Sequence, residues 1–129
     1  MNSQSTCPFC DLLQKGEFLE QRESAVVIRD AFPVSAGHLL VISRMHEEHF
    51  TALDSIVRND MLALATEMAD RALKQAGVTG CNIGVNVGRS AGQTVMHAHL
   101  HVIPRREGDV ADPRGGVRWV VPSKAKYWD

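Results

Sequence analysis

The sequence predicts an α+β fold, in which one antiparallel sheet carries a single main helix on one of its faces. Three features lead to this expectation: short apolar segments separated by turn residues, one long segment with helical periodicity, and a histidine-rich segment with the two-residue repeat of a strand. A chain of 129 residues is long enough to bury one core without disulfide bonds. We therefore expect a single domain over residues 1–129.

The expected strands are short segments bounded by turn residues. In chain order they cover residues 18–20, 25–29, 39–43, 82–87 and 95–105. The first two form a hairpin, and the last two are joined by a loop that contains Gly88 and Gly92. One antiparallel sheet accommodates all of them, and its histidine-bearing strand is expected to face a ligand.

The main helix is predicted over residues 54–76. Its apolar side chains recur at three- and four-residue steps and so form one face for packing on the sheet. These side chains are Ile56, Val57, Met61, Leu64, Ala65, Met68, Ala72 and Leu73. Asp54 is the expected N-cap and Gly77 the expected C-terminal stop.

Composition narrows the classes of function and the cellular location to be expected. Fourteen basic and 15 acidic residues give a net charge of -1, which argues against a general nucleic-acid surface. The first six residues are polar and no apolar run approaches about 18 residues, so we expect neither a secretory signal nor a membrane span. Three cysteines, an odd number, favour a reducing compartment, and hence the cytoplasm.

The carboxyl-terminal part has a local excess of basic residues. Between Ile103 and Lys126 six basic residues stand against three acidic ones. They are Arg105, Arg106, Arg114, Arg118, Lys124 and Lys126 against Glu107, Asp109 and Asp112. A basic rim beside the histidine strand suits a polyphosphate, whereas the alternative is a solvated tail. The aromatic residues Trp119, Tyr127 and Trp128 belong to a further edge strand or to a partner-facing patch.

Half of the six histidines stand at two-residue spacing, as His97, His99 and His101. In an extended strand, residues at this spacing lie on one face, so the three imidazoles are expected to share a surface. Imidazole serves as nucleophile, general acid or base, or metal ligand near neutral pH. The spacing therefore predicts one site with divided roles, the alternative being a polar strand face.

The loop before these histidines supports a phosphate site. Its glycines allow tight turns and close backbone approach, and Gln93 and Thr94 add hydrogen-bond donors, although a simple hairpin turn is the alternative. Attack on phosphorus needs a nucleophile, stabilised oxygens and a proton for the leaving group. The middle residue, His99, is the favoured nucleophile because it has an imidazole on either side.

Residues 92–105 resemble the signature of the histidine-triad (HIT) family, and residues 30–42 resemble its earlier strand pair. The likeness covers residues 7 to about 109. It implies that a nucleoside phosphate binds and that His99 attacks the α-phosphorus to form a nucleotidyl-histidine. It also implies that His101 protonates the leaving oxygen and that a backbone carbonyl near His97 sets the His99 tautomer.

The same resemblance assigns further residues. Asp30 matches the carboxylate that holds ribose hydroxyls, with turn capping as the alternative, and Asn86 matches a residue near the sugar and phosphate. Gln93 and Thr94 are expected to hold phosphate oxygens. HIT proteins are homodimers, and an open sheet edge here suits pairing across a two-fold axis.

Cys7 and Cys10 stand at the spacing of a metal-binding pair, although a redox disulfide or buried thiols also fit it. Some HIT proteins build a zinc site from such a pair, a mid-chain histidine and the first histidine of the triad. By this resemblance Cys7, Cys10, His46 and His97 form a structural zinc site, with His49 as the alternative to His46.

Together these residues predict a nucleotide hydrolase. Residues 92–95 and 104–109 look more like the diadenosine polyphosphate hydrolase branch of the family than the phosphoramidase branch. The alternatives are a purine nucleoside phosphoramidate hydrolase, a nucleotide-sensing module with little turnover, and a histidine-ligated metalloenzyme.

Overall fold

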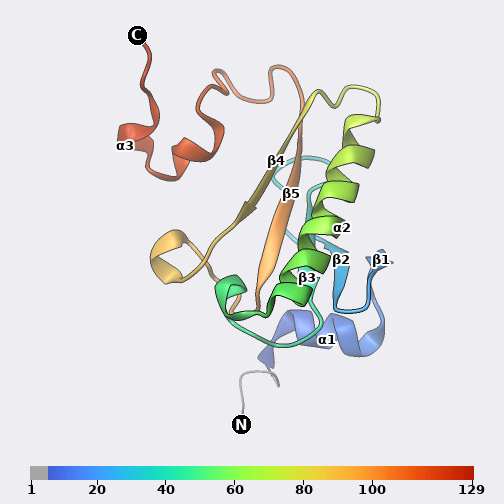
Figure 1. Ribbon diagram of the computed structural model, residues 1–129. Coiled ribbons are helices and arrows are strands. Elements are labelled where there is room, and N and C mark those ends of the chain that lie inside the picture. Colours follow the sequence, from blue (N-terminus) through green and yellow to red (C-terminus); the bar gives the residue numbers. More distant parts are fainter. Residues whose placement is uncertain (1–5) are drawn as a thin grey trace.

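The computed structural model describes residues 6–129 and confirms the α+β fold (Figure 1). Five strands form one antiparallel sheet in the order β1-β2-β3-β5-β4. The strands are β1 (Glu20–Gln21), β2 (Ala25–Arg29), β3 (Leu39–Ser43), β4 (Gly80–Val85) and β5 (His99–Arg105). The expected hairpin, the strand at 39–43 and the pairing of the last two strands are therefore present, with shifted ends for β1, β4 and β5.

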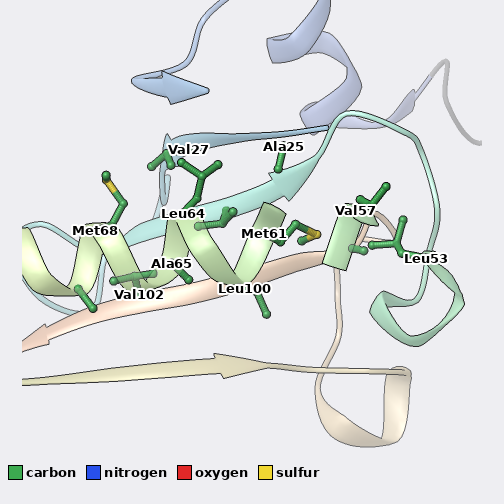
Figure 2. Packing of buried hydrophobic residues seen from close by; sticks show 13 residues of the cluster. Ala25, Val27, Leu53, Val57, Met61, Leu64, Ala65, Met68, Leu100 and Val102 are labelled. Carbon is green, nitrogen blue, oxygen red and sulfur yellow. The ribbon is translucent and has the colours of Figure 1, made fainter. Parts of the chain in front are cut away.

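One face of the sheet carries α2 (Ser55–Leu73), the predicted main helix. The Asp54 side chain accepts a hydrogen bond from the Val57 N–H at 3.1 Å, which confirms the expected N-cap. Figure 2 shows Met61 and Leu64 of the helix packed toward Leu100 of β5, and all three are almost completely buried. The helix ends three residues before the expected position, and the chain then turns at Gly77 with φ of 84°.

The opposite face carries α1 (Pro8–Lys15), which the sequence analysis did not predict. Its local signals are present: the Cys7 side chain caps the first turn by accepting from the Cys10 N–H at 3.4 Å, and Pro8 occupies the first turn. Gly16 closes the helix in the left-handed region. Phe9 packs from this helix into a second core cluster with Val26, Ile28, Leu40 and Ile42.

The strand that bears the histidines is shorter than expected, and this corrects the prediction that all three share it. β5 begins at His99, whereas residues 95–97 form a bend. The Ala98 N–H donates to the Glu47 carbonyl at 2.7 Å, outside the β5 ladder, because the segment after β3 folds back there. His99 and His101 therefore lie on the strand, and His97 lies just before it.

The carboxyl-terminal segment does not form the edge strand considered above. It contains a short 3-10 helix, η4 (Gly116–Val120), which contacts β4, and α3 (Pro122–Ala125), which packs on η4 away from the sheet (Figure 1). β4 is the terminal strand of the sheet and pairs with β5. Among residues 6–129, no helix combines the length and apolar character that crossing a bilayer requires.

Candidate functional site

His99 and His101 lie next to each other on the face of β5 opposite α2, with their ring centroids 5.2 Å apart. On β3, Ile42 is the register partner of His99 and Leu40 that of His101. The neighbouring strand therefore holds both imidazole-bearing residues in a rigid ladder. Phe9 of α1 contacts the His99 ring edge-on, with centroids 5.1 Å apart.

The protonation pattern of His99 follows from one hydrogen bond. Its Nδ1 lies 2.7 Å from the backbone carbonyl oxygen of His97. A carbonyl oxygen only accepts, so Nδ1 carries the proton and Nε2 keeps its lone pair. Burial lowers the pKa of His99, an effect that outweighs the opposing influence of this hydrogen bond and of Asp30. The neutral ring thus has an unprotonated Nε2 at pH 7, as a nucleophile requires.

His101 takes part in a second network, with His38 and Asp30. The Val34 N–H donates to His38 Nδ1 at 3.1 Å, so the proton of neutral His38 is on Nε2. His38 Nε2 lies 2.9 Å from His101 Nδ1 and 3.3 Å from Asp30 Oδ2. When His38 donates to His101 Nδ1, the His101 proton is held on Nε2, where it is available to a substrate.

His38 is a site residue that the sequence analysis missed. It lies within residues 30–42, which resemble the family's earlier strand pair, and its side chain is buried and bridges Asp30 and His101. A histidine directly before an apolar strand was the only local signal. Its partner His101 is 63 residues away, so no local pattern identifies the pair.

The expected metal ligands come together at the amino-terminal end of β5. Cys7, Cys10, His46 and His97 place one ligand atom each within 4.8 Å of one another. Cys7 Sγ is 3.3 Å from His97 Nδ1, and Cys10 Sγ is 3.3 Å from His46 Nδ1. Burial, with a smaller contribution from Cys7, raises the pKa of the Cys10 thiol to about 11.

The residues present fit a structural zinc ion. Two sulfurs and two imidazole nitrogens are a common tetrahedral donor set. His97 Nε2 lies 2.6 Å from the Ser43 carbonyl oxygen, to which it must donate, so the lone pair on Nδ1 faces the sulfurs. His49, the alternative ligand, is exposed and stands outside this cluster.

The loop before the histidines is held by Gln93. Its buried amide donates to the carbonyls of Glu48, at 2.6 Å, and Val95, at 3.1 Å, and it accepts from the Gly88 N–H at 2.9 Å. Its polar atoms are therefore engaged by backbone, which differs from the expected contact with a phosphate oxygen. Thr94 is exposed, and Asn86 lines a cavity together with His38 and His101.

The comparisons with known proteins identify the family of this chain. The HIT domain model matches residues 14–108, which is most of the chain. The chain belongs to the histidine triad (HIT) family. An uncharacterised HIT-like protein of Mycoplasma genitalium is 36% identical over 109 residues, with 82% of this chain and 77% of that protein covered.

Two further relatives bear on the site. A protein of Arabidopsis thaliana, the adenylylsulfatase HINT3, is 32% identical over 110 residues, which cover 82% of this chain and 55% of the relative. The crystal structure of a zinc-bound histidine triad family protein from Mycobacterium smegmatis superposes with a TM-score of 0.75 at 33% identity. That match covers 85% of this chain and 82% of the other.

Proposed function

We propose that this protein hydrolyses nucleoside phosphate derivatives at the α-phosphorus through a nucleotidyl-His99 intermediate. The observation that carries the proposal is the hydrogen bond from His99 Nδ1 to the His97 carbonyl, because it leaves Nε2 unprotonated within a rigid strand. The histidine triad relatives are consistent with a nucleotide ligand, and the adenylylsulfatase name of one relative indicates action on an adenylyl compound.

The first chemical step uses His99 and His101. His99 Nε2 forms a bond to phosphorus, and the bond from phosphorus to the leaving atom breaks. Burial lowers the pKa of free His101, but a bound phosphate would favour its protonated form. In that complex the N–H groups of His38 Nε2 and His101 Nδ1 would both face the Asp30 carboxylate, which lies 3.3 and 3.9 Å from them, so His38 would no longer donate to His101. His101 gives its Nε2 proton to the leaving atom and becomes neutral.

The second step regenerates the enzyme. Water attacks the phosphorus and gives a proton to neutral His101, while the bond from phosphorus to His99 Nε2 breaks and returns its electron pair to the ring. The net reaction consumes one water and releases a nucleoside monophosphate. Both histidines return to their starting protonation states.

The remaining site residues bind rather than react. We assign Asp30 to the ribose hydroxyls, and Thr94, Asn86 and the backbone amides of residues 88–94 to the sugar and phosphate oxygens. Gln93 keeps that loop in place through its backbone partners. A zinc ion held by Cys7, Cys10, His46 and His97 would join α1 to the start of β5, so we propose a structural role for it.

We also propose an oligomeric state, a cellular location and a substrate preference. Ile83 and Val85 are exposed on the edge strand β4, which supports a homodimer formed across that edge. The free cysteines Cys7 and Cys10 support a cytoplasmic enzyme. We also propose that residues 1–129 act as one domain. The sequence favours a dinucleoside polyphosphate as substrate over a phosphoramidate.

The covalent intermediate provides the test. The protein is mixed with a dinucleoside polyphosphate or an adenosine phosphoramidate, quenched within the turnover time and examined by mass spectrometry of its peptides. We expect one added nucleoside monophosphate on the peptide that contains His99, and none in His99→Ala. Wild-type turnover by His99→Ala would exclude the mechanism, tight binding without turnover would favour a sensor, and loss of turnover on chelation with the fold intact would favour a metalloenzyme.

A further inference from the structure

The loop between β2 and β3, residues 30–38, carries two groups of the proton-transfer network. Asp30 stands at its start and His38 at its end, and the Val34 N–H within it donates to His38 Nδ1 at 3.1 Å. That bond decides which ring nitrogen of His38 is protonated, since a nitrogen that accepts cannot also carry the proton. The position of the Val34 N–H therefore affects the proton that His38 directs at His101.

Val34 has little packing of its own to hold it. Residues 31–34 are all exposed, and the Val34 side chain is 72% exposed. Exposed backbone with few buried side chains opens at low free energy. The next residue, Ser35, is bonded outside the loop, and it is the restraint closest to the Val34 N–H on that side.

Ser35 joins the loop to β5. Its hydroxyl donates to the Pro104 carbonyl oxygen at 2.7 Å, across 69 positions of the sequence. Ser35 is half-buried and Pro104 is almost completely buried, so water competes poorly for this bond. Removing the hydroxyl would leave the Pro104 carbonyl without this donor and the loop without this anchor.

The strand register explains why the Pro104 carbonyl is available. β3 and β5 pair as far as Leu39 and Val102, and the same register continued by two residues would pair Gly37 with Pro104. Proline has no N–H, so this pair could form only one of its two bonds, and the ladder ends before it. Gly37 turns the chain away with φ of 89°, and a Cβ on it would lie 3.4 Å from Pro104 Cγ. The Ser35 hydroxyl supplies the donor that the carbonyl lacks.

We propose that Ser35 is a positioning residue for the proton transfer. Its bond to Pro104 holds the Val34 N–H in place, and that N–H keeps the His38 proton on Nε2. In the free enzyme the His38 Nε2 proton points at His101 Nδ1, which places the proton of neutral His101 on Nε2, toward the substrate. The inference rests on the proposed function and adds to it a residue that acts through His38.

Asp30 acts on the same pair of histidines but does not distinguish them. Its Oδ2 lies 3.3 Å from His38 Nε2 and 3.9 Å from His101 Nδ1. A carboxylate between two ring nitrogens favours a proton on either of them. The Val34 N–H acts on His38 alone, so it decides that His38 carries the shared proton. Without the anchor at Ser35, His38 can hold its proton on Nδ1, and its bare Nε2 then draws the His101 proton to Nδ1.

The first test observes the ring protons directly. In the free protein at neutral pH, with isotope-labelled histidine, a long-range nitrogen–proton correlation spectrum distinguishes protonated from bare ring nitrogens. We expect a bare Nδ1 in His38 and His101 of wild type, and partial protonation of both Nδ1 atoms in Ser35→Ala. Ser35→Thr, which keeps the hydroxyl, should resemble wild type. Ser24→Ala is the matched control, because it removes a hydroxyl that donates to Asp60 at 2.6 Å, in the turn before β2.

The second test compares two leaving groups. Ser35→Ala should lower kcat/KM for adenosine phosphoramidate by about threefold to tenfold, the order that one lost hydrogen bond gives. Cleavage of a dinucleoside polyphosphate should change less, because a phosphate leaves as an anion whereas the amine needs a proton. Ser35→Thr should recover the loss, and Ser24→Ala should keep the wild-type ratio of the two rates.

Three results would overturn the proposal. A Ser35→Ala spectrum identical to that of wild type would mean that Asp30 sets the tautomer alone. Equal losses on the two substrates would indicate that Ser35 binds the substrate or only stabilises the loop. A loss in Ser35→Thr as large as in Ser35→Ala would exclude the hydroxyl as the cause. If wild type cleaves neither compound, the proposed function fails, and the spectra of the free protein still decide the role of Ser35.

Discussion

Two clusters of side chains flank His99, and they differ in what their imidazoles can do. Cys7, Cys10, His46 and His97 lie on one side, and Asp30, His38 and His101 on the other. Both bring potential metal ligands within 4.8 Å of one another, so proximity alone does not distinguish them.

The two clusters differ in the backbone group that hydrogen-bonds to one histidine of each, on the ring nitrogen that faces away from the cluster. His97 donates from Nε2 to the Ser43 carbonyl, which directs a lone pair at the sulfurs and suits a metal ion. His38 accepts from the Val34 N–H, which directs a proton at His101 and suits proton transfer. A metal bound at His38 Nε2 would require loss of that proton. The Ser43 carbonyl thus makes the first cluster suitable for a metal ion, and the Val34 N–H makes the second suitable for proton transfer.

We expect the largest loss of turnover from a change at His99, which lies between the two clusters. His99→Ala removes the proposed nucleophile while it leaves both clusters in place, so turnover should fall by about 10⁴-fold or more. Nucleotide binding measured by calorimetry and the zinc content should remain close to wild type. Activity within tenfold of wild type would show that neither cluster serves a nucleotidyl-histidine mechanism.

A comparison of two leaving groups tests the role of Asp30, His38 and His101 in proton transfer. His101→Ala should slow phosphoramidate cleavage by about 10²-fold or more, and polyphosphate cleavage less, because the amine requires a proton. His38→Leu should act in the same direction, whereas His38→Gln, which retains an N–H donor, should recover part of the rate. Equal losses on both substrates would contradict the role of this cluster in protonation.

The metal cluster is tested by composition and stability. Purified protein is expected to contain about one zinc per chain, and Cys10→Ala should lose it together with several degrees of thermal stability. Cys81→Ala is the matched control, because Cys81 is a free, partly buried cysteine outside the cluster. Two results would exclude a structural zinc site: protein purified without chelator that contains no metal, or a Cys10→Ala variant as stable as Cys81→Ala.

The smallest expected effect is a dependence of stability on pH. Burial lowers the pKa of His38, His99 and His101, so below about pH 6.5 the unfolded chain binds more protons than the folded one. The contribution of these histidines to the free energy of unfolding is therefore fully present above that pH. It is lost as the pH falls toward their lower pKa values in the folded chain. The melting temperature should drop by a few degrees between pH 7.5 and 5.5, and less in the double variant His38→Gln and His101→Gln. A flat profile in wild type would contradict this account.

The sequence by itself determined the elements whose causes are local. The helical repeat and the cap at Asp54 placed the start of α2, and an apolar run bounded by polar residues gave β3 its observed limits. Two-residue spacing also placed His99 and His101 on one face of a strand. Each of these features depends on residues a few positions apart, which is why periodicity and capping rules reach them.

The tertiary structure alone decided the chemistry of each imidazole. His97 leaves the strand because its partners are Ser43, 54 residues away, and Cys7, 90 residues away. The family resemblance already favoured His46 over His49, and the folded chain brings His46 to Cys10. Only the folded chain joins His38 to His101. An imidazole becomes a ligand, a nucleophile or an acid according to which nitrogen its neighbours occupy, and those neighbours meet only when the sheet has formed.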